Sequence, residues 1–261
     1  MEETPRAQGA YNPHPCNEHE ADGALGTQGA RNPRACLDPS CYLVIGPENC
    51  ARRPFAHVLR QALDAGFTCV QLRSKESSAR ECMELLELAA RTIEQAGAQG
   101  RVTLLMNDRV DVALAARMAG VKVDGVHVGQ SDVPPDACRR LLGPQAVVGL
   151  SAHAPQIAAY LQGHANAAQT VDYFGVGPLH PTNSKQDLEK DEGGHVITRT
   201  LDEIATLAAS SPLPLVVGGG VTAADLPALK AAGARGFFVI SAVCGADDPA
   251  AAARQLVDAW R

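Results

Sequence analysis

The sequence predicts a closed barrel of eight parallel strands, a (β/α)8 fold, preceded by a polar tail. From residue 41 onward, eight short runs rich in Val, Ile, Leu or Phe alternate with longer segments of helical period. The runs are apolar at successive positions, which is typical of parallel strands covered on both faces. Because alternating strand and helix units join through right-handed crossovers, eight of them can close into a ring.

Each unit has its own signals. The expected strands span residues 42–45, 67–72, 102–106, 125–128, 146–150, 171–176, 215–217 and 237–240. The expected helices begin near residues 54, 78, 109, 134, 154, 200, 223 and 248. Three of these starts carry a capping box, in which a hydroxyl residue is followed three positions later by an acid: Ser78 with Glu81, Thr200 with Glu203, and Thr222 with Asp225.

An open doubly wound sheet is the alternative architecture. That fold favours a glycine-rich fingerprint directly after the first strand. The segment at this place, GPENCARRP at residues 46–54, does not contain one. We therefore expect the barrel over residues 41–261.

Residues 1–40 differ from the rest of the chain. They hold five Pro, four Gly and few large aliphatic residues. Such a segment cannot bury enough apolar surface to offset the entropy lost on ordering, so we expect a disordered tail. The sequence leaves open the alternative that this tail is attached to the barrel near Cys36.

Composition and charge exclude several classes of protein. The chain is 46% apolar and 20% charged, and its net charge of −6 disfavours non-specific binding to nucleic acid or to anionic membranes. No apolar stretch reaches the ~20 residues that cross a bilayer, and the acidic start lacks the features of a signal peptide. The eight cysteines include no C-x-x-C pair. We expect reduced thiols in a cytoplasmic protein, with the oligomeric state left open.

Polar residues follow most of the expected strands, where the reactive face of a (β/α)8 barrel lies. The segments are Gln71 to Lys75, Asn107 and Asp108, Gly129 to Asp132, Ser151, His180 to Lys185, Gly218 to Val221, and Ile240 with Ser241. Seven of the eight strands thus contribute polar or glycine-rich residues to one end. We expect the functional site there.

The last two of these loops favour phosphate binding. Three glycines, Gly218 to Gly220, precede one expected helix, and Ser241 precedes another. Close backbone approach and unpaired amides at helix starts suit an anion, and these loops are the usual phosphate site of the fold. The alternative is that the glycines only form a tight turn.

Asp108 and Asp132 follow neighbouring strands, so their carboxylates can converge on one cation. Two carboxylates, with water and substrate phosphate completing the shell, suit Mg²⁺ better than Zn²⁺ or Ca²⁺. The alternative for either residue is a helix N-cap, especially for Asp132 before Pro134. Nearby, Arg73, Lys75 and Lys185 concentrate positive charge that fits a diphosphate shared with Mg²⁺.

Three histidines lie near the same end, His127, His153 and His180. None has a Ser or Cys partner in an arrangement that predicts a nucleophilic triad. A histidine in a barrel is more often a hydrogen-bonded packing residue than a catalyst. We therefore leave these histidines outside the expected catalytic set.

Seven motifs, in order along about 200 residues, resemble those of the thiamine phosphate synthase family. They are QLRSK at 71–75, NDRVDVALA at 107–115, DGVHVGQSD at 124–132, GLSAH at 149–153, FGVGPLHPTNSK at 174–185, GGGV at 218–221 and VIS at 239–241. The resemblance implies an Mg²⁺-dependent transferase. Its reaction would join hydroxymethylpyrimidine diphosphate to a thiazole phosphate, or its carboxylated tautomer, giving thiamine phosphate and pyrophosphate.

The resemblance also implies roles for individual residues. The pyrimidine diphosphate would be held by Gln71, Leu72, Arg73, Ser74, Lys75, Asn107, Ser151 and Lys185, of which Arg73, Lys75, Ser151 and Lys185 are the catalytic set. The thiazole phosphate would be held by Thr182, Asn183, Ser184, Gly220, Ile240 and Ser241. Asp108 and Asp132 would bind Mg²⁺. In this family the diphosphate is thought to leave first, and the thiazole nitrogen then attacks the resulting cation.

The sequence departs from the family pattern in loop 6, where Ser184 replaces a threonine and keeps the hydroxyl. The long acidic stretch after Lys185 predicts a lid over the substrates. Three rival functions stay open: a thiazole tautomerase-like enzyme, a non-catalytic barrel that binds a pathway phosphate, and a different phosphate-handling barrel such as an epimerase. The Asp108, Asp132, Arg73 and Lys75 set favours the synthase, and an epimerase needs paired acid and base residues that are not evident.

Overall fold

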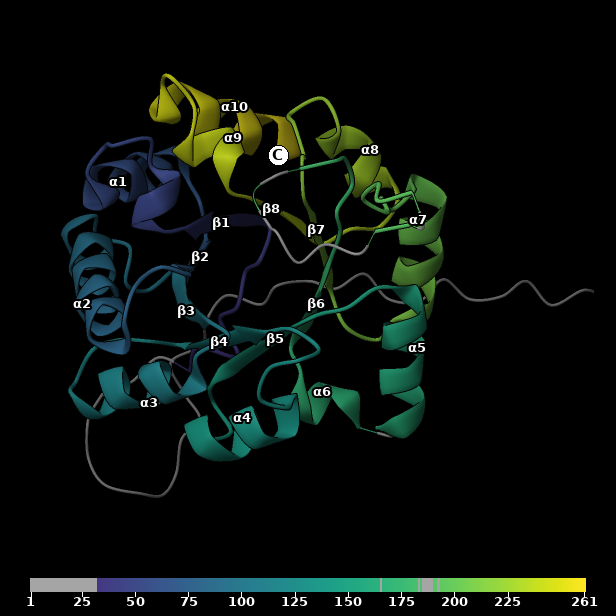
Figure 1. The fold of residues 1–261 in the computed structure, drawn as a ribbon, viewed down its shortest axis with the longest axis horizontal. Helices are drawn as coiled ribbons and strands as arrows, with labels where there is room; N and C mark the ends of the chain where they lie inside the picture. The colour runs from purple at the N-terminus through teal and green to yellow at the C-terminus, as the bar shows by residue number, and fades with distance from the viewer. Residues whose placement is uncertain (1–31, 165, 183, 185–189, 192) are drawn as a thin grey trace, which may run out of the picture.

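The structure is a computed structural model that describes residues 32–261 apart from 165, 183, 185–189 and 192. Its eight strands form a closed parallel barrel in chain order, and β8 pairs with β1 (Figure 1). The strands are β1 (Cys41–Ile45), β2 (Cys69–Leu72), β3 (Thr103–Asn107), β4 (Gly125–Val128), β5 (Val147–Ser151), β6 (Tyr173–Val176), β7 (Leu215–Gly218) and β8 (Gly236–Val239). The predicted fold class is confirmed, and the doubly wound alternative is excluded.

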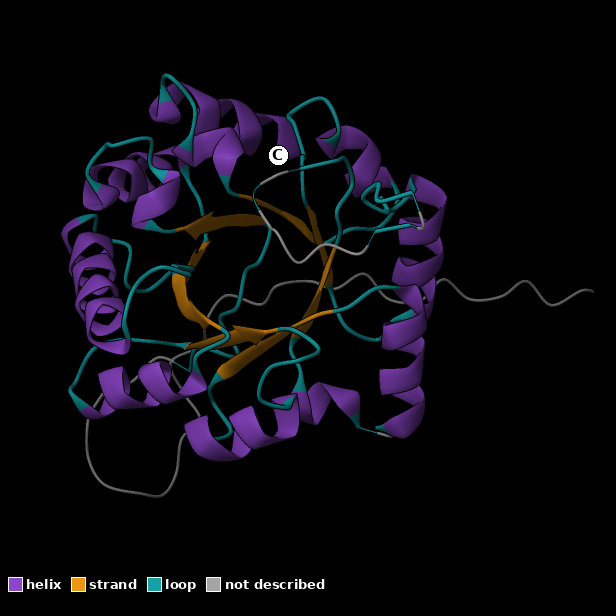
Figure 2. Ribbon diagram, in the orientation of Figure 1, coloured by secondary structure: helices purple, strands orange, loops and turns teal. Residues whose placement is uncertain are grey.

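The helices surround the ring of strands (Figure 2). They are α1 (Phe55–Ala65), α2 (Ala79–Gln95), α3 (Val110–Met118), α4 (Pro135–Leu142), α5 (Ala154–Gly163), α6 (Ala167–Thr170), α7 (Leu201–Ser210), α8 (Leu226–Ala231), α9 (Ser241–Cys244) and α10 (Pro249–Trp260). The short helices α6 and α9, and a 3-10 turn η1 (Pro47–Asn49), were not expected. Helices of one turn bury too few residues to leave a periodic pattern in the sequence.

The capping boxes are only partly present. At α2, the Ser78 hydroxyl accepts from the backbone N–H of Glu81, and the Glu81 carboxylate accepts from the Ser78 N–H. At α7, the Thr200 hydroxyl accepts from the Glu203 N–H. The third expectation was wrong, because α8 begins at Leu226 and its N-cap is Asp225. The Asp225 carboxylate instead accepts from the N–H and hydroxyl of Thr222.

The core has two parts. The larger lies between the strands and the helices, and contains Val70 and Leu72 of β2. The smaller fills the barrel interior and consists of Tyr42, Val44, Cys69, Leu105, Val147, Tyr173 and Val216. Because side chains alternate along a strand, Gln71 and Arg73 share the inward register of Cys69. The end of β2 thus directs polar side chains toward the mouth of the barrel.

Residues 32–40 pack against the end of the barrel where the strands begin. The Arg34 guanidinium binds the Asp172 carboxylate and the Ala168 carbonyl oxygen, and Leu37 contacts the inner core. This part of the expected tail is therefore attached to the barrel. Residues 1–31 of the predicted disordered tail lie outside the described residues.

Among the described cysteines, Cys41, Cys50, Cys69, Cys82, Cys138 and Cys244 are buried free thiols. Cys36 is disulfide-bonded, which corrects the expectation that every cysteine is reduced. Across the described residues, no helix combines the length and apolar content required to traverse a bilayer.

Candidate active site

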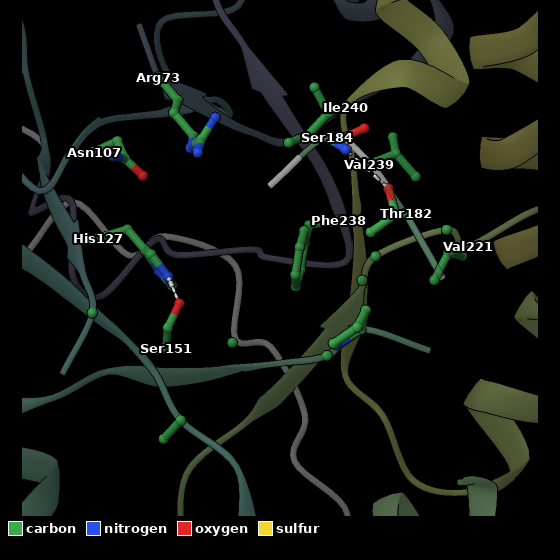
Figure 3. A pocket seen from close by; sticks show the side chains of 18 of the residues that line it. Arg73, Asn107, His127, Ser151, Thr182, Ser184, Val221, Phe238, Val239 and Ile240 are labelled. Atoms are coloured by element: carbon green, nitrogen blue, oxygen red, sulfur yellow. Dashed lines mark hydrogen bonds between the residues drawn. The ribbon is translucent and has the colours of Figure 1, made fainter. Parts of the chain in front are cut away.

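A cavity of about 690 Å³ opens at the end of the barrel where the strands finish (Figure 3). The loops after β2 to β8 line it. The carboxyl ends of parallel strands meet at the same end of a barrel, which explains why residues far apart in sequence converge here. Of the predicted site residues, those that line the cavity are Arg73, Lys75, Asn107, Asp108, Asp132, Ser151, Thr182, Ser184, Gly220, Ile240 and Ser241.

The lining falls into two arcs of the ring. We call the residues after β2 to β5 the charged wall: Arg73, Lys75, Asn107, Asp108, Asp132 and Ser151. We call those after β6 to β8 the glycine wall: Thr182, Ser184, Gly220, Ile240 and Ser241. In Figure 3, Arg73, Asn107 and Ser151 lie on one side and Thr182, Ser184 and Ile240 on the other, with the Phe238 ring between them.

Among the described residues, three predicted site residues are not part of the cavity lining: Gln71, Leu72 and Ser74. Asn183 and Lys185 lie outside the described residues. Within the loop predicted as a lid, residues 183, 185–189 and 192 also lie outside the described residues.

Gln71 is only 3% exposed, and its Nε2 has no hydrogen-bond partner among the described residues. Its inward register on β2 places it below Arg73, toward the barrel interior. A buried unpaired donor costs free energy unless a ligand satisfies it. Gln71 therefore fits a role in binding a polar group that enters the cavity deeply.

Leu72 and Ser74 have structural partners. The Leu72 side chain is fully buried in the outer core, so it cannot reach the cavity. The Ser74 hydroxyl donates to Glu48, 3.0 Å away, and the Lys75 backbone N–H donates to the same carboxylate at 3.1 Å. Sequence reasoning missed Glu48, which holds the β2–α2 loop through these two contacts. Glu48 lies in the 3-10 turn η1, which is too short to leave a recognisable pattern in the sequence.

Lys75 and Asp108 form an ion pair in the charged wall, with Lys75 Nζ 2.7 Å from Asp108 Oδ2. Burial opposes ionisation of Asp108, but the Lys75 ammonium, Asp132 and Asn107 together hold its pKa below the usual value. Asp108 has a left-handed backbone, with φ +59°. Aspartate and asparagine tolerate that conformation better than most residues.

Asp132 accepts a hydrogen bond from the backbone N–H of Gly129 at 2.7 Å. The N-cap of α4 is Pro134, so the alternative reading of Asp132 as the cap of that helix is wrong. Burial raises the pKa of Asp132, the neighbouring Asp108 raises it further, and the Gly129 N–H opposes the rise. Asp108 and Asp132 both line the cavity, and the repulsion between the two carboxylates disfavours their simultaneous ionisation.

These two carboxylates fit a divalent cation. The described residues contain no cluster of three or more His, Cys, Asp or Glu that could hold a metal. Mg²⁺ often takes only one or two protein carboxylates and completes its shell with water and substrate phosphate. A cation between Asp108 and Asp132 would also offset the repulsion that raises the pKa of Asp132.

The glycine wall brings backbone close to the cavity. Gly219 and Gly220 have φ values of +81° and +71°, which favour glycine. A Cβ on Gly220 would lie 2.8 Å from His180 Cβ, so a side chain there would clash with loop 6. The His180 Nε2 is 2.9 Å from Asp225 Oδ1, which ties this loop to the start of α8 and fits the expected packing role of His180.

Loop 6 also contacts the last loop. The Ser184 hydroxyl lies 3.1 Å from the Ser241 hydroxyl, at the first residue of α9. The first amides of a helix have no intrahelical partner. Hydroxyls and backbone N–H groups thus gather at this wall, which can bind an anion.

The cavity is also lined by His127, which was expected near this end as a packing residue, and by Arg199 and Phe238, which sequence reasoning missed. His127 was left outside the catalytic set, yet its Nε2 lies 2.8 Å from the Ser151 hydroxyl oxygen (Figure 3). Arg199 pairs with Glu203 at 3.5 Å. Phe238 occupies the floor between the two walls. His127 and Phe238 lie on β4 and β8 and point inward, which a run apolar on both faces does not reveal, and Arg199 lies in the loop directly before α7.

Comparison with known proteins shows the family to which the chain belongs. The family model described as thiamine monophosphate synthase matches residues 41–243. Thiamine-phosphate synthase of Desulfitobacterium hafniense (strain Y51) is 38% identical over 225 residues, covering 86% of this chain and 99% of the relative. That of Laribacter hongkongensis is 40% identical over 222 residues, covering 84% and 94%.

Solved structures support the same grouping. The thiamine phosphate pyrophosphorylase of Pyrococcus furiosus aligns with a TM-score of 0.68 and 26% identity, covering 85% of this chain and 95% of that one. A 3-hexulose-6-phosphate synthase, at 18% identity and a TM-score of 0.56, shares the fold. The chain therefore belongs to the thiamine monophosphate synthase family, whose members are transferases of thiamine biosynthesis.

Proposed function

We propose that this chain joins hydroxymethylpyrimidine diphosphate to the thiazole phosphate and releases thiamine phosphate and pyrophosphate. The observation that carries the proposal is one cavity with two unlike walls facing each other across Phe238. One wall offers charges for a diphosphate and the other offers hydroxyls and backbone for a single phosphate. Two anionic substrates can therefore lie in one cavity with their rings between the walls.

The charged wall would bind the diphosphate. Arg73 can grip a phosphoryl group with two N–H donors, and the Lys75 ammonium adds a point charge. We propose that Lys185 also binds the diphosphate. Asp108 and Asp132 would hold Mg²⁺, which when bound would supply positive charge to the departing diphosphate.

The glycine wall would bind the thiazole phosphate through the Thr182 and Ser184 hydroxyls and through backbone N–H groups near Gly220 and Ser241. Anchoring this phosphate fixes the position of the thiazole nitrogen relative to the pyrimidine. Such alignment converts a reaction between two molecules into one within a single complex. The rate at which the thiazole nitrogen forms the new bond would then depend on the geometry of the barrel.

The chemistry proposed is dissociative. The bond between the pyrimidine methylene carbon and the diphosphate oxygen breaks first, and its electron pair leaves with the diphosphate. The thiazole nitrogen then donates its lone pair to the methylene cation. Arg73 and Lys75 stabilise the charge that builds on the leaving group, and no general base is needed.

The test is pyrophosphate release when the purified chain is mixed with both half-molecules, with and without Mg²⁺. We expect equal amounts of pyrophosphate and thiamine phosphate, formed only with the metal. Isomerisation of the thiazole phosphate without joining would instead indicate a tautomerase. Binding of either substrate without release would indicate a regulatory barrel. The net charge of −6 supports small-molecule partners rather than nucleic acid or membrane. We also propose a cytoplasmic location, which the six buried free thiols among the described residues support.

The acidic pair predicts a pH-dependent need for Mg²⁺. The raised pKa of Asp132 means that this carboxyl takes up a proton at a higher pH than an ordinary aspartate. Because the metal and the proton compete, the Mg²⁺ concentration for half-maximal rate should rise as the pH falls toward the pKa of this carboxyl, and the rise should begin at a higher pH than for an ordinary aspartate. The check is a set of Mg²⁺ titrations at several pH values. In Asp132→Asn this shift should shrink, and an unchanged shift would contradict the assignment.

A further inference from the structure

Four side chains form a continuous hydrogen-bonded chain from the barrel interior to the cavity. The hydroxyl oxygens of Tyr42 and Tyr173 are 2.9 Å apart. The Tyr173 hydroxyl lies 2.8 Å from His127 Nδ1, and His127 Nε2 lies 2.8 Å from the Ser151 hydroxyl oxygen. Both tyrosines are at most 2% exposed, whereas Ser151 lines the cavity. These hydrogen bonds therefore connect the buried interior of the barrel to the place where substrate would bind.

The strands leave room for this chain. His127, Gly149 and Tyr173 stand side by side in the register of β4, β5 and β6. A Cβ on Gly149 would overlap the Tyr173 hydroxyl and lie 2.5 Å from His127 Nδ1. Gly175 pairs with Ser151, and a Cβ on Gly175 would lie 2.9 Å from His127 Cε1. Two glycines thus provide the space in which the imidazole and phenol rings stack, with centroids 5.5 Å apart.

The number of available protons determines which group donates in each of these hydrogen bonds. Each phenol has one proton, and burial raises the pKa of both tyrosines far above the usual value, so both stay protonated. Within the described part of the protein, the Tyr173 hydroxyl is the one polar partner of the Tyr42 hydroxyl. Tyr42 must therefore donate to Tyr173, because otherwise its proton would be buried without an acceptor.

The remaining protons then have fixed places. Tyr173 accepts from Tyr42, so its own proton goes to His127 Nδ1. A neutral imidazole that accepts at Nδ1 carries its proton at Nε2, which donates to Ser151. The Ser151 oxygen is thus occupied as an acceptor, and its proton is left for the cavity. The reversed order would leave a buried Tyr42 donor unsatisfied.

We propose that Tyr173 and His127 are positioning residues that fix the Ser151 hydroxyl as a hydrogen-bond donor to the departing diphosphate. The inference rests on the proposed function, since it assigns the diphosphate to the charged wall. A hydrogen bond from a hydroxyl to an anionic oxygen is short and strong, and it strengthens as charge builds on the leaving group. The buried side chains of Tyr173 and His127 would then affect the rate of diphosphate departure by orienting the Ser151 hydroxyl.

The test compares two phenylalanine substitutions of matched size. Tyr173→Phe removes the donor to His127 Nδ1 and should lower kcat/KM for the pyrimidine diphosphate by about tenfold or more, with the KM for thiazole phosphate unchanged. Tyr42→Phe removes an equally buried hydroxyl, but Tyr173 can still donate to His127. Its activity should stay within about twofold of the parent. Equal losses in both variants would overturn the proposal.

Coupling to Ser151 provides a second criterion. The affinity for inorganic pyrophosphate with Mg²⁺, measured by calorimetry, should fall in Ser151→Ala and in Tyr173→Phe. The double variant should be no weaker than Ser151→Ala alone, because Tyr173 acts through that hydroxyl. Losses that multiply would show that Tyr173 acts independently, against the proposal.

The tautomer can be measured without substrate. In the free protein, ¹⁵N chemical shifts of the His127 ring, assigned with a His127→Asn variant, should show protonation at Nε2 and a bare Nδ1. A ring protonated at Nδ1 would overturn the proposed direction whatever the enzymatic activity. Because this readout needs no turnover, its failure is distinguishable from failure of the proposed function.

Discussion

Asp108→Asn should lower the Mg²⁺-dependent rate of pyrophosphate release by about 100-fold or more. The substitution keeps the size and most of the hydrogen bonding of the side chain but removes the negative charge that would hold the metal. Asparagine also tolerates the left-handed backbone at this position, where φ is +59°. Alanine would add backbone strain and so mix two effects. Steady-state rates over a range of Mg²⁺ concentrations are the measurement.

Asp111→Asn is the matched control for this prediction. Asp111 lies three residues further along the same loop and helix start, has 63% of its side chain exposed, and pairs with Arg109 rather than facing the cavity. Its substitution should leave the rate within about twofold of the parent, since exposed ion pairs contribute little. Full activity in Asp108→Asn would show that Asp108 does not bind the metal. Circular dichroism would verify that both variants are folded.

Gly149→Ala should both destabilise the protein and remove most of its activity. The added Cβ would overlap the Tyr173 ring and lie 2.5 Å from His127 Nδ1, in an interior with no room to shift. Overpacking of this kind costs about 1–3 kcal/mol, which for a chain of this length lowers Tm by roughly 2–12 °C. Displacing the His127 ring would also break its contact with Ser151. Thermal unfolding and the pyrophosphate assay would measure the two effects.

Gly163→Ala provides the comparison for the same chemical change. Nothing lies within 4 Å of a Cβ at Gly163, which is the last residue of α5. Alanine favours a helix more than glycine does, so Tm should stay the same or rise slightly. If Gly149→Ala matched this control in Tm and rate, the ring pair would not be confined as the structure indicates.

The barrel could be predicted because its pattern is local. Each apolar run and each helical segment is visible within about a dozen residues, and the loops after the strands are where this fold places its chemistry. Asp108 and Asp132 were found because polar residues directly after an apolar run stand out. Their placement in one cavity followed from topology alone.

The pairing of His127 with Ser151 could not be predicted in this way. The two residues are joined through the register of β4 with β5, which the sequence of either strand does not fix. Strands apolar on both faces also hide which side chains point inward, so Tyr173 and Phe238 looked like ordinary core residues. At Thr222, local propensity predicted a helix start, but Asp225 became the N-cap, and its carboxylate also contacts His180.

The closed ring has a consequence for how affinity for the two partners can change. The charged wall and the glycine wall belong to different arcs of one hydrogen-bonded cylinder, so their separation is set by strand number rather than by a hinge. Substitutions in one arc should then change the affinity for one substrate and leave the affinity for the other unchanged. Within such a rigid frame, each half of the entrance can diverge separately, provided the span between the two anchors stays constant.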